Sequence, residues 1–551
     1  MRPPASRAPV ARIATIFLIL GCSITWARGA TEIDVTETPL GTTRHILIKS
    51  TTPSPDGKRL AYATATGKAV QIVVDGKPYP GDFQGLAAGG ISFSPDSKHV
   101  AVLAQTGGKW VVVIDGAAGQ PYNTYAKGSF AFSLDGARWL VTADDAGKRL
   151  LLVDGKPGKA YDDIIHPRFS ADGKRIAYVA RVDTHFFAVI DGVESAPYDA
   201  VMDETIVFSP DGSQTAYAAR AGDRWSLVTG SGQPKTYDAV AHGGIAFSPG
   251  GKRLAAAVSD NGQWFVVDGA SVGKPFARIF DDSLAFSADG KRLAFVAERD
   301  GKMLVVDESA EGAPFDAIET PLLFSPDSHH LAYLARNGKQ WTVVLDGKPT
   351  GDFDKVSSRP IFAGSLASPM PGNPALRSTS EPASSAPSSA AASTPATQPA
   401  LGAQAPRLAF VAAHGRQMVV VVDGKESAAF DEIVLPPLFN SDGARMAFAA
   451  RRGRKQFAVI DGVETAPVDA IGRLTFSPDG KHVAYASQSG GELRIVVDSA
   501  QTGPLGGFIH GAALVFDSPD SFNTLAFRAN ELLGIHVAIK AGKWPESDRE
   551  E

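Results

Sequence analysis

The sequence predicts an all-β fold, a β-propeller built from twelve four-stranded repeats of about 39 residues. A Phe-Ser-Pro-Asp-Gly-Lys-Arg-Leu-Ala-Tyr pattern recurs at intervals of 37–40 residues, with one interval of 77. A Val-Val-Asp-Gly pattern follows nearly every copy, and no segment shows helical periodicity of useful length. The twelve copies begin at Pro53, Phe93, Phe132, Phe169, Phe208, Phe247, Phe286, Phe324, Phe362, Phe439, Phe476 and Phe516.

Each repeat is expected to supply four strands, a to d. Strand a is the apolar run that ends in Phe-Ser, and Ser-Pro-Asp-Gly forms the following turn, in which Pro presets φ, Asp caps backbone donors and Gly accepts positive φ. Strand b alternates apolar and polar residues, as in residues 175–179, and strand c is a continuous apolar run, as in residues 111–114. Asp-Gly predicts a tight hairpin into strand d, which we assign to the aromatic-Asp-Ala-Val segment, such as residues 198–201.

The number of rings depends on how the repeats are grouped. Propellers usually have four to eight blades, which favours two six-bladed rings, residues 30–280 with repeats one to six and residues 281–545 with repeats seven to twelve. One large ring is the alternative. The last repeat ends after strand c, and residues 32–35 are expected to supply its missing strand, which fits one large ring directly.

The repeated motif Phe-Ser-Pro-Asp-Gly-Lys-x-Leu-Ala-Tyr resembles the WD-like, TolB-type propeller repeat over about residues 31–540. This resemblance implies a propeller, and the family includes periplasmic interaction proteins and the propeller domains of some peptidases. Six-bladed rings are common in that family, which is a further reason to expect two of them. The Val-Val-Asp-Gly and aromatic-Asp half of the repeat departs from TolB itself, so the identity of a partner does not carry over.

The N-terminus predicts export. Arg2, Arg7 and Arg12 precede a short apolar run at residues 13–21, which is the pattern of a signal segment over residues 1–29. Ala27-Arg28-Gly29 offers an ordinary cleavage site, whereas residues 19–22 resemble a bacterial lipobox in which Cys22 is acylated. We therefore expect a periplasmic protein or an outer-membrane-anchored lipoprotein, with a secreted protein as the alternative.

Composition excludes several classes of protein. The net charge of −5, from 54 Lys and Arg against 59 Asp and Glu, argues against a nucleic-acid partner. With one Cys in the chain, no intrachain disulfide and no Cys-based metal site can form. Residues 364–404 form a Ser/Ala/Pro/Thr-rich insertion expected to be disordered, and residues 546–551 read as a disordered acidic tail.

No motif in the sequence predicts catalysis, a metal site or a cofactor. Gly-Ala-Ser-Val-Gly at residues 269–273 matches a nucleophile elbow, but it falls in a predicted hairpin with no helix after it. The eleven His show no metal-binding spacing, and there is no phosphate-binding loop. Four Trp that open strand c are expected to pack between blades, and the basic turn at residues 451–455 is expected to be solvated.

The sequence differs most between repeats just before strand a. Loops between strands d and a converge on the channel of a propeller, and binding residues usually lie on the variable loops of a rigid scaffold. We expect a non-catalytic scaffold for a protein partner in the cell envelope, with membrane contact only through a lipid at Cys22; the alternative is a ligand-binding or enzymatic propeller with its site at the channel mouth. The candidate binding residues at that mouth are His166, Arg168, Asp203, Glu204, His242, Asp281, Asp282, Glu319, Arg359, Arg473 and His510.

Overall fold

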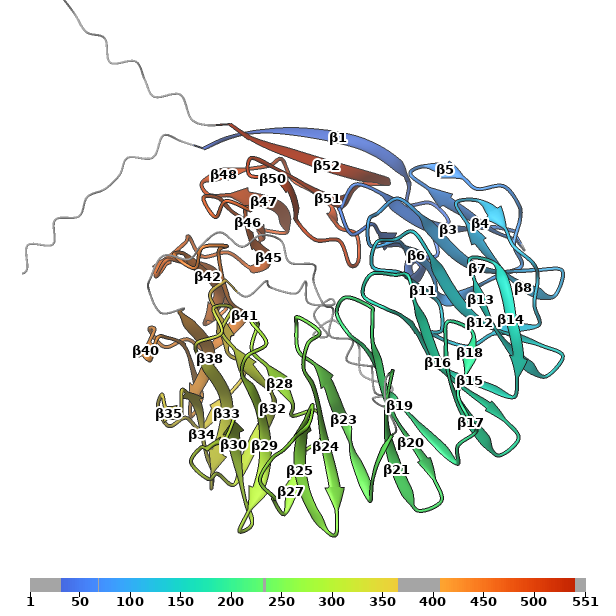
Figure 1. The fold of residues 1–551 in the computed structure, drawn as a ribbon. Helices are drawn as coiled ribbons and strands as arrows, with labels where there is room; N and C mark the ends of the chain where they lie inside the picture. Colours follow the sequence, from blue (N-terminus) through green and yellow to red (C-terminus); the bar gives the residue numbers. More distant parts are fainter. Residues whose placement is uncertain (1–30, 68, 231–233, 365–406, 541–551) are drawn as a thin grey trace, which may run out of the picture.

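The computed structural model describes residues 31–67, 69–230, 234–364 and 407–540, and these form twelve antiparallel sheets arranged around one ring (Figure 1). The sheets follow one another in sequence order, and we number them as blades 1 to 12. Strand a lies at the inside of the ring and the last strand at the outside, which in blade 12 is the long N-terminal strand β1 (Figure 1). The predicted β-propeller of twelve repeats is confirmed.

Blades 1 to 4 contain β2 to β18. Blade 1 has β2 (Thr52–Pro53), β3 (Leu60–Thr66), β4 (Ala69–Val74) and β5 (Lys77–Pro78), preceded by the 3-10 turn η1 (Ile48–Ser50). Blade 2 has β6 (Gly85–Phe93), β7 (Val100–Thr106), β8 (Lys109–Ile114) and β9 (Ala117–Ala118). Blade 3 has β10 (Thr124–Tyr125), β11 (Ala131–Phe132), β12 (Trp139–Asp145), β13 (Lys148–Val153) and β14 (Lys156–Tyr161). Blade 4 has β15 (Asp163–Phe169), β16 (Ile176–Val182), β17 (His185–Ile190) and β18 (Val193–Glu194).

Blades 5 to 8 contain β19 to β35. Blade 5 has β19 (Ala200–Phe208), β20 (Thr215–Ala221), β21 (Arg224–Thr229) and β22 (Lys235–Tyr237). Blade 6 has β23 (Ala239–Phe247), β24 (Leu254–Asp260), β25 (Gln263–Asp268) and β26 (Ser271–Val272). Blade 7 has β27 (Arg278–Ile279), β28 (Ala285–Phe286), β29 (Leu293–Arg299), β30 (Lys302–Asp307) and β31 (Ala310–Glu311). Blade 8 has β32 (Ala317–Phe324), β33 (Leu331–Asn337), β34 (Gln340–Leu345) and β35 (Lys348–Pro349).

Blades 9 to 12 contain β36 to β52 and β1. Blade 9 has β36 (Lys355–Val356), β37 (Ile361–Phe362), β38 (Leu408–His414), β39 (Gln417–Val422) and β40 (Lys425–Glu426). Blade 10 has β41 (Glu432–Phe439), β42 (Met446–Arg452), β43 (Lys455–Ile460) and β44 (Val463–Glu464). Blade 11 has β45 (Ala470–Phe476), β46 (Val483–Ser489), β47 (Glu492–Val497) and β48 (Ala500–Gln501). Blade 12 has β49 (Gly507–Phe508), β50 (Val515–Ser518), β51 (Ser521–Arg528), β52 (Glu531–Lys540) and β1 (Glu32–Thr42).

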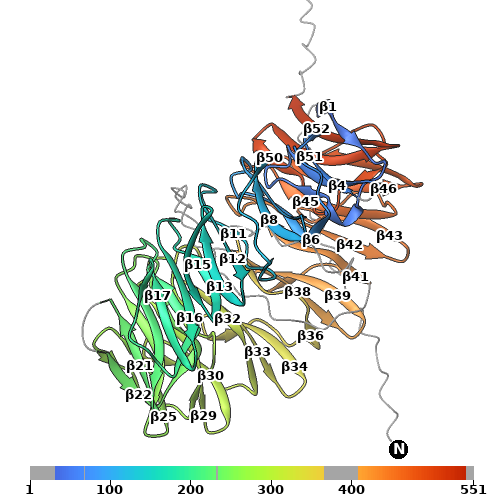
Figure 2. The same ribbon diagram turned by 90° about the vertical axis from the view of Figure 1, so that its right-hand side faces the viewer.

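The grouping into two six-bladed rings is wrong, and the single large ring is the observed arrangement. Blade 6 packs on blade 7, because Ala257 shares a buried cluster with Phe295. Blade 12 packs on blade 1, because Leu525 shares one with Leu60. The expected boundary after residue 280 falls between β27 and β28, which both pair with β29 in one sheet. Figure 2 shows the first and last blades side by side at one end of the ring and β17, β21 and β25 at the other.

The ring closes through the N-terminal strand, as the sequence predicted. Strand β1 pairs antiparallel with β52, from Glu32 opposite Lys540 to Thr42 opposite Glu531. Arg528 binds Glu37 through both terminal nitrogens, at 2.6 and 2.7 Å, and adds an ion pair to this seal. The predicted signal segment with Cys22, the insertion after Gly364 and the tail at 546–551 lie outside the described residues.

The turns form as their residues predict. The serine hydroxyl of each Ser-Pro-Asp-Gly turn donates to the Asp carboxylate and accepts the amide five residues after the serine, as Ser209 does with Asp211 and Gln214. In the hairpin after strand c, Asp191 (φ 52°) and Gly192 (φ 80°) both have positive φ, which a two-residue type I′ turn requires.

The predicted strand d is misplaced. In most blades the last strand is the short segment directly after the hairpin, and the aromatic residue only bridges back to the start of strand c, as Tyr198 does with Phe186. In blades 3 and 5 the last strand runs on to the aromatic residue, Tyr161 and Tyr237. The Ala-Val that follows begins strand a of the next blade, where Ala200 pairs with Arg220. The aromatic-Asp motif is therefore the crossover between blades.

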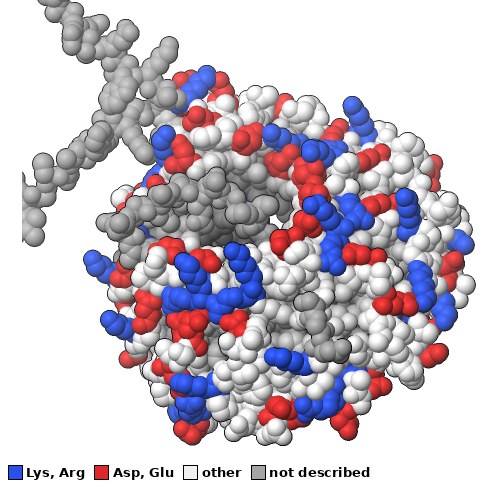
Figure 3. Space-filling view, in the orientation of Figure 1, with Lys and Arg blue, Asp and Glu red and all other residues white. Residues whose placement is uncertain are grey.

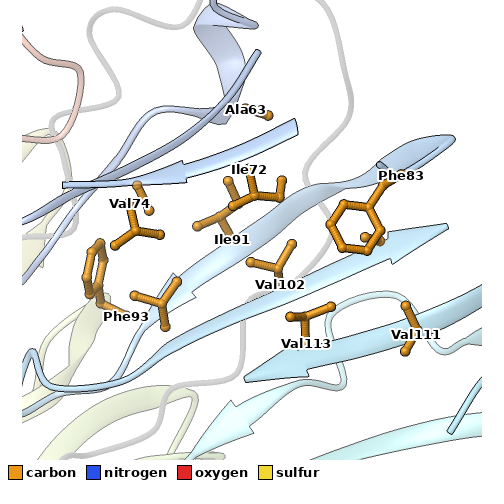
Figure 4. Close-up of a cluster of buried hydrophobic side chains, with 12 residues drawn as sticks. Ala63, Ile72, Val74, Phe83, Ile91, Phe93, Val102, Val111 and Val113 are labelled. Atoms are coloured by element: carbon orange, nitrogen blue, oxygen red, sulfur yellow. The ribbon is translucent and has the colours of Figure 1, made fainter. Parts of the chain in front are cut away.

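Apolar side chains fill the space between neighbouring blades. Figure 4 shows the cluster between blades 1 and 2, where Ile72 and Val74 of β4 meet Ile91 and Phe93 of β6. Of the four Trp at the start of strand c, three pack in such clusters between consecutive blades: Trp225, Trp264 and Trp341. The prediction of packing between blades holds for these three.

Candidate functional site

A repeated arginine joins each of seven blades to the next blade. Arg175 at the start of β16 donates from Nε to Asp191 of its own blade at 2.8 Å. Its Nη1 donates to the carbonyl of Gly212 in the next a–b turn at 2.9 Å, and its guanidinium lies over the ring of Phe208 at 5.4 Å. The residues in this position, which we call the clamp arginines, are Arg59, Arg138, Arg175, Arg253, Arg292, Arg407 and Arg445.

The repeated aspartates also have structural partners. The Asp of the Asp-Gly hairpin accepts the clamp arginine on one oxygen and a strand-b amide on the other, as Asp191 does with the amide of Ile176 at 2.9 Å. The Asp of the crossover motif caps the b–c turn of the blade it enters, as Asp199 does with the amide of Gly222 at 2.7 Å. In the a–b turn, the Ser94 hydroxyl lowers the pKa of Asp96 to about 2. These carboxylates stabilise the fold.

Strand a is interrupted halfway along every blade. In blade 5, Met202 pairs with Ala218 and Val207 with Ala216, so the residues between Met202 and Val207 have no partner in strand b. Such a bulge lies on the side of strand a away from strand b, which is the inside of the ring. We call the twelve interruptions, with their flanking paired residues, the inner belt; it comprises residues 46–52, 86–91, 125–131, 165–168, 202–207, 240–245, 279–285, 319–323, 356–361, 433–438, 472–475 and 508–515.

All eleven candidate residues lie in the inner belt. The sequence analysis had placed them in loops at the mouth of the channel. The interruption faces the middle of strand b, so these residues lie partway along the inner wall of the ring. The exposed candidates are His166, His242, Asp281, Asp282, Glu319, Arg359 and His510. Asp203 and Glu204 lie within β19. Figure 3 shows the ring hollowed at its middle, with Lys, Arg, Asp and Glu side chains around the hollow.

Two candidate arginines serve the fold instead of facing solvent. Arg473 is half-buried, donates from Nε to the carbonyl of Ala512 at 2.7 Å and lies 4.2 Å from the ring centre of Phe508 in blade 12. Burial lowers the pKa of Arg473. Arg168 likewise donates from Nη1 to the carbonyl of Ile206 in blade 5 at 3.1 Å. Both residues tie one blade's belt segment to the next.

Hydrogen bonds hold other parts of the belt in place. Asp281 accepts the amide of His242 at 3.1 Å, and the amide of Asp282 donates to the His242 carbonyl at 3.1 Å, so the belts of blades 6 and 7 are joined. Belt hydroxyls replace missing strand pairing: Thr205 accepts the amide of Ala218 at 2.8 Å, and Ser358 accepts that of Val411 at 2.9 Å. These bonds fix the backbone that presents the exposed belt side chains.

Sequence reasoning missed Lys49 and Lys127, which are exposed belt residues of blades 1 and 3. It also missed the clamp arginines. A signal for the clamp was available, because an Arg stands 15 or 16 residues before the Asp of the Asp-Gly hairpin in seven repeats. The belt lysines have no such repeated signal.

The other motifs noted in the sequence do not form a catalytic or metal site in the described residues. Ser271 of the elbow-like motif is exposed in the two-residue strand β26. In the basic turn, Arg451 binds Glu432, Arg452 binds Glu464 and Lys455 binds Asp469, so acidic partners balance most of its charge. In the described ranges, no cluster of three His, Cys, Asp or Glu side chains is arranged to hold a metal ion. No helix in that part of the chain is long and apolar enough to span a membrane.

Outside the belt, the ring has an open groove of about 470 Å³ between blades 9 and 10. Its floor contains Val420, Val422, Met446 and Phe448, and Lys425 stands at its rim.

Among the comparisons with known proteins, only the one with solved structures found matches. No protein-family model and no curated protein matches the chain. Among solved structures, TolB from Acinetobacter baumannii is 16% identical, over 54% of this chain and 77% of that one, with a TM-score of 0.23. The Swd1 β-propeller domain of Myceliophteria thermophila is 13% identical, over 44% and 92%, with a TM-score of 0.23. Dihydro-heme d1 dehydrogenase NirN is 15% identical, over 58% and 80%, with a TM-score of 0.25. With scores this low, the assignment as a β-propeller rests on the strands and blades of this chain itself.

Proposed function

We propose that the protein is a non-catalytic scaffold whose inner belt binds a protein partner in the bacterial cell envelope. The observation that carries this proposal is a division of labour within each repeat. Residues that recur in most blades, such as Arg175, Asp191 and Asp199, bond to the blade itself or to its neighbour. The exposed belt residues differ from blade to blade, and variable side chains on a rigid frame are what selective binding needs.

The charges of the belt indicate which charges the surface of a partner should carry. The exposed acidic residues of the belt belong to blades 7 and 8, and its exposed Lys and Arg belong to blades 1, 3 and 9. Exposed examples are Asp281 and Glu319 on one arc and Lys49, Lys127 and Arg359 on the other. A partner with both basic and acidic patches complements this wall, because opposite potentials steer association and fix orientation.

The location in the envelope is part of the proposal and is supported by the sequence. Residues 1–29 have the charge and apolar pattern of a signal segment, and Cys22 ends the apolar run. The near-neutral balance of charges in the chain fits a protein partner better than a nucleic acid.

The experiment compares partner capture by two triple variants of equal charge change. The belt variant carries Asp281→Asn, Asp282→Asn and Glu319→Gln, and the control carries Asp183→Asn, Asp223→Asn and Asp300→Asn in exposed b–c turns. Asn tolerates the positive φ of Asp282, Asp183 and Asp300, so neither variant should lose stability. Each protein is crosslinked in envelope fractions, and captured proteins are identified by mass spectrometry.

We expect a protein captured by the parent and by the control variant to be lost from the belt variant. Equal capture by all three proteins would place the binding surface outside the acidic arc of the belt. Melting curves of the three proteins should coincide, because exposed substitutions of this kind change stability by less than about 0.5 kcal/mol.

A further inference from the structure

Strand β1 is the longest of the outer strands that the structure describes. In nine other blades the last strand has two residues, and in blades 5 and 3 it has three and six. Strand β1 has 11 residues and lies at the outer rim of blade 12, with β52 on its inner side (Figure 1). No strand in the described part of the chain pairs with its other edge, so blade 12 ends in a long open edge.

Alternate residues of β1 present their backbone N–H and C=O groups to this open edge. The amide of Ile539 in β52 donates to the carbonyl of Asp520 at 2.7 Å, on the side away from β1. Ile33 is opposite Ile539, and opposite residues of antiparallel strands point their backbone groups either both towards or both away from each other. Ile33, Val35 and Glu37 therefore point these groups outward, and no other group among the described residues bonds them.

The carboxylates of β1 do not close this edge by repulsion alone. Acidic side chains on an edge strand often keep other strands away. Here Asp34 binds Lys540 at 2.6 Å, and Glu37 binds Arg528 at 2.6 Å, so basic residues of the same blade balance both charges. Between these two residues Val35 is 37% exposed, which places an uncovered apolar side chain at the middle of the edge.

One antiparallel register lets β1 pair with β1 of a second copy of the chain. When the two-fold axis passes through the position of Val35, Val35 faces its own copy and Ile33 faces Glu37. Every outward N–H of residues 33–37 then meets an outward C=O of the other strand. The exposed Val35 side chains also lie side by side and cover each other.

The remaining side chains of β1 are compatible with this register. Glu32 faces Thr38 of the second copy, and Asp34 faces Thr36. No two carboxylates are directly opposite, and a threonine hydroxyl can donate a hydrogen bond to the carboxylate that it faces.

Neighbouring registers are worse, for two different reasons. An axis at Asp34 places Asp34 opposite its own copy, and like charges directly opposite destabilise a strand pair. An axis at Thr36 places Ile33 opposite Pro39, which has no N–H to donate. The pattern of charges and the proline therefore select the axis at Val35.

We propose that the open edge of β1 joins two copies of this chain across a two-fold axis at Val35. The two blades 12 then form one continuous antiparallel sheet, and the same surface of each copy serves both sides of the contact, as in other two-fold dimers. A second copy is favoured over a strand of another protein because the side chains of β1 complement themselves in this register. The dimer goes beyond the scaffold function and does not depend on it.

Sedimentation equilibrium of the full exported protein tests the proposal, at concentrations from about 1 to about 100 µM. We expect the parent protein to form a dimer in this range. Val35→Lys places two lysines opposite each other at the axis and should raise the dimer Kd at least about tenfold. Thr36→Lys is the matched control, because its lysine faces Asp34 of the second copy and should leave the Kd unchanged or lower it. Both positions are exposed, so neither lysine should unfold the chain.

A disulfide measures the register independently. Opposite residues that exchange backbone bonds have Cα atoms about 5.5 Å apart, which is within reach of a disulfide. After oxidation, Val35→Cys should give a covalent dimer in much higher yield than Thr36→Cys, whose copies are offset along the strands.

Three results would overturn the proposal. The first is a monomeric parent over the whole concentration range, whether the edge of β1 stays open or another segment occupies it. The second is a dimer that Val35→Lys does not weaken, since such a dimer uses a different surface. The third is equal weakening by Val35→Lys and Thr36→Lys together with equal disulfide yields at the two positions, which would exclude the axis at Val35.

Discussion

Removing one clamp arginine should cost far more stability than removing an exposed arginine of the same blade. Arg445 donates from Nη1 to the carbonyls of Gly480 at 3.1 Å and Lys481 at 2.6 Å, binds Asp461 through Nε at 2.8 Å and lies over Phe476 at 5.4 Å. Its side chain is 21% exposed, so solvent screens these contacts only in part. The cation–π contact contributes about 0.5–1 kcal/mol and the charged hydrogen bonds about 1–2 kcal/mol. Arg445→Ala should therefore lower the free energy of unfolding by about 2 kcal/mol.

The matched control is Arg454→Ala, which removes an exposed arginine from the b–c turn of the same blade. Its cost should stay below about 0.5 kcal/mol. Urea unfolding followed by tryptophan fluorescence measures both variants, and the midpoints are compared at equal slope. Equal midpoints for the two variants would refute the view that the repeated arginine holds neighbouring blades together.

Four further predictions concern other parts of the chain. Phe410→Ala, at a side chain that is 1% exposed in the cluster between blades 8 and 9, should cost about 3–5 kcal/mol in urea unfolding. The hydrogen bond to Asp498 raises the pKa of His482. The stabilisation that protonated His482 gives is therefore full below the unfolded pKa of about 6.5 and is lost as pH rises through the folded pKa. The urea midpoints of the parent and of His482→Gln should converge towards about pH 8.5. Replacing residues 365–406 by a short Ser-Pro-Asp-Gly turn should leave the melting temperature unchanged or raise it, because loop closure depends weakly on length; a large fall would contradict this. Cys22→Ser should abolish lipid labelling and membrane association if Cys22 is acylated, whereas association that persists without any label in the parent excludes the lipoprotein.

The strands inside each repeat were predictable because their determinants are local. Ser-Pro-Asp-Gly and Asp-Gly specify turns through the φ angles of their own residues, so strands a, b and c follow from the sequence. The last strand was misassigned because Tyr198 and Asp199 look like one unit, yet the backbone bonds of Tyr198 go to Phe186 and that of Asp199 to Arg220 in the next blade. Two residues that are adjacent in the sequence can thus belong to different blades, and the sequence pattern does not mark where the chain passes from one blade to the next.

The number of blades in the ring and the position of the inner belt could not be predicted from the sequence, for a different reason. The number of blades in a ring depends on the small angle between neighbouring sheets, which side-chain packing such as that of Ala257 on Phe295 determines. The eleven belt candidates were found through their variation between repeats, but their position midway along strand a depends on the register with strand b. The same variation hid the roles of Arg168 and Arg473, whose acceptors are carbonyls of the following blade.

Because β1 closes blade 12, the ring can close only after the last blade has been synthesised. Glu37 and Arg528 are 491 positions apart, so the first strand must wait, unpaired, until the last blade has been synthesised and delivered. Bringing ends this far apart together in a random chain costs about 5 kcal/mol of entropy, which stacking of the intervening blades reduces by bringing the two ends near each other. Until that moment β52 lacks its outer neighbour. A chain that is tethered or trimmed at its N-terminus before release would therefore leave an open sheet edge, the kind of surface that other strands join.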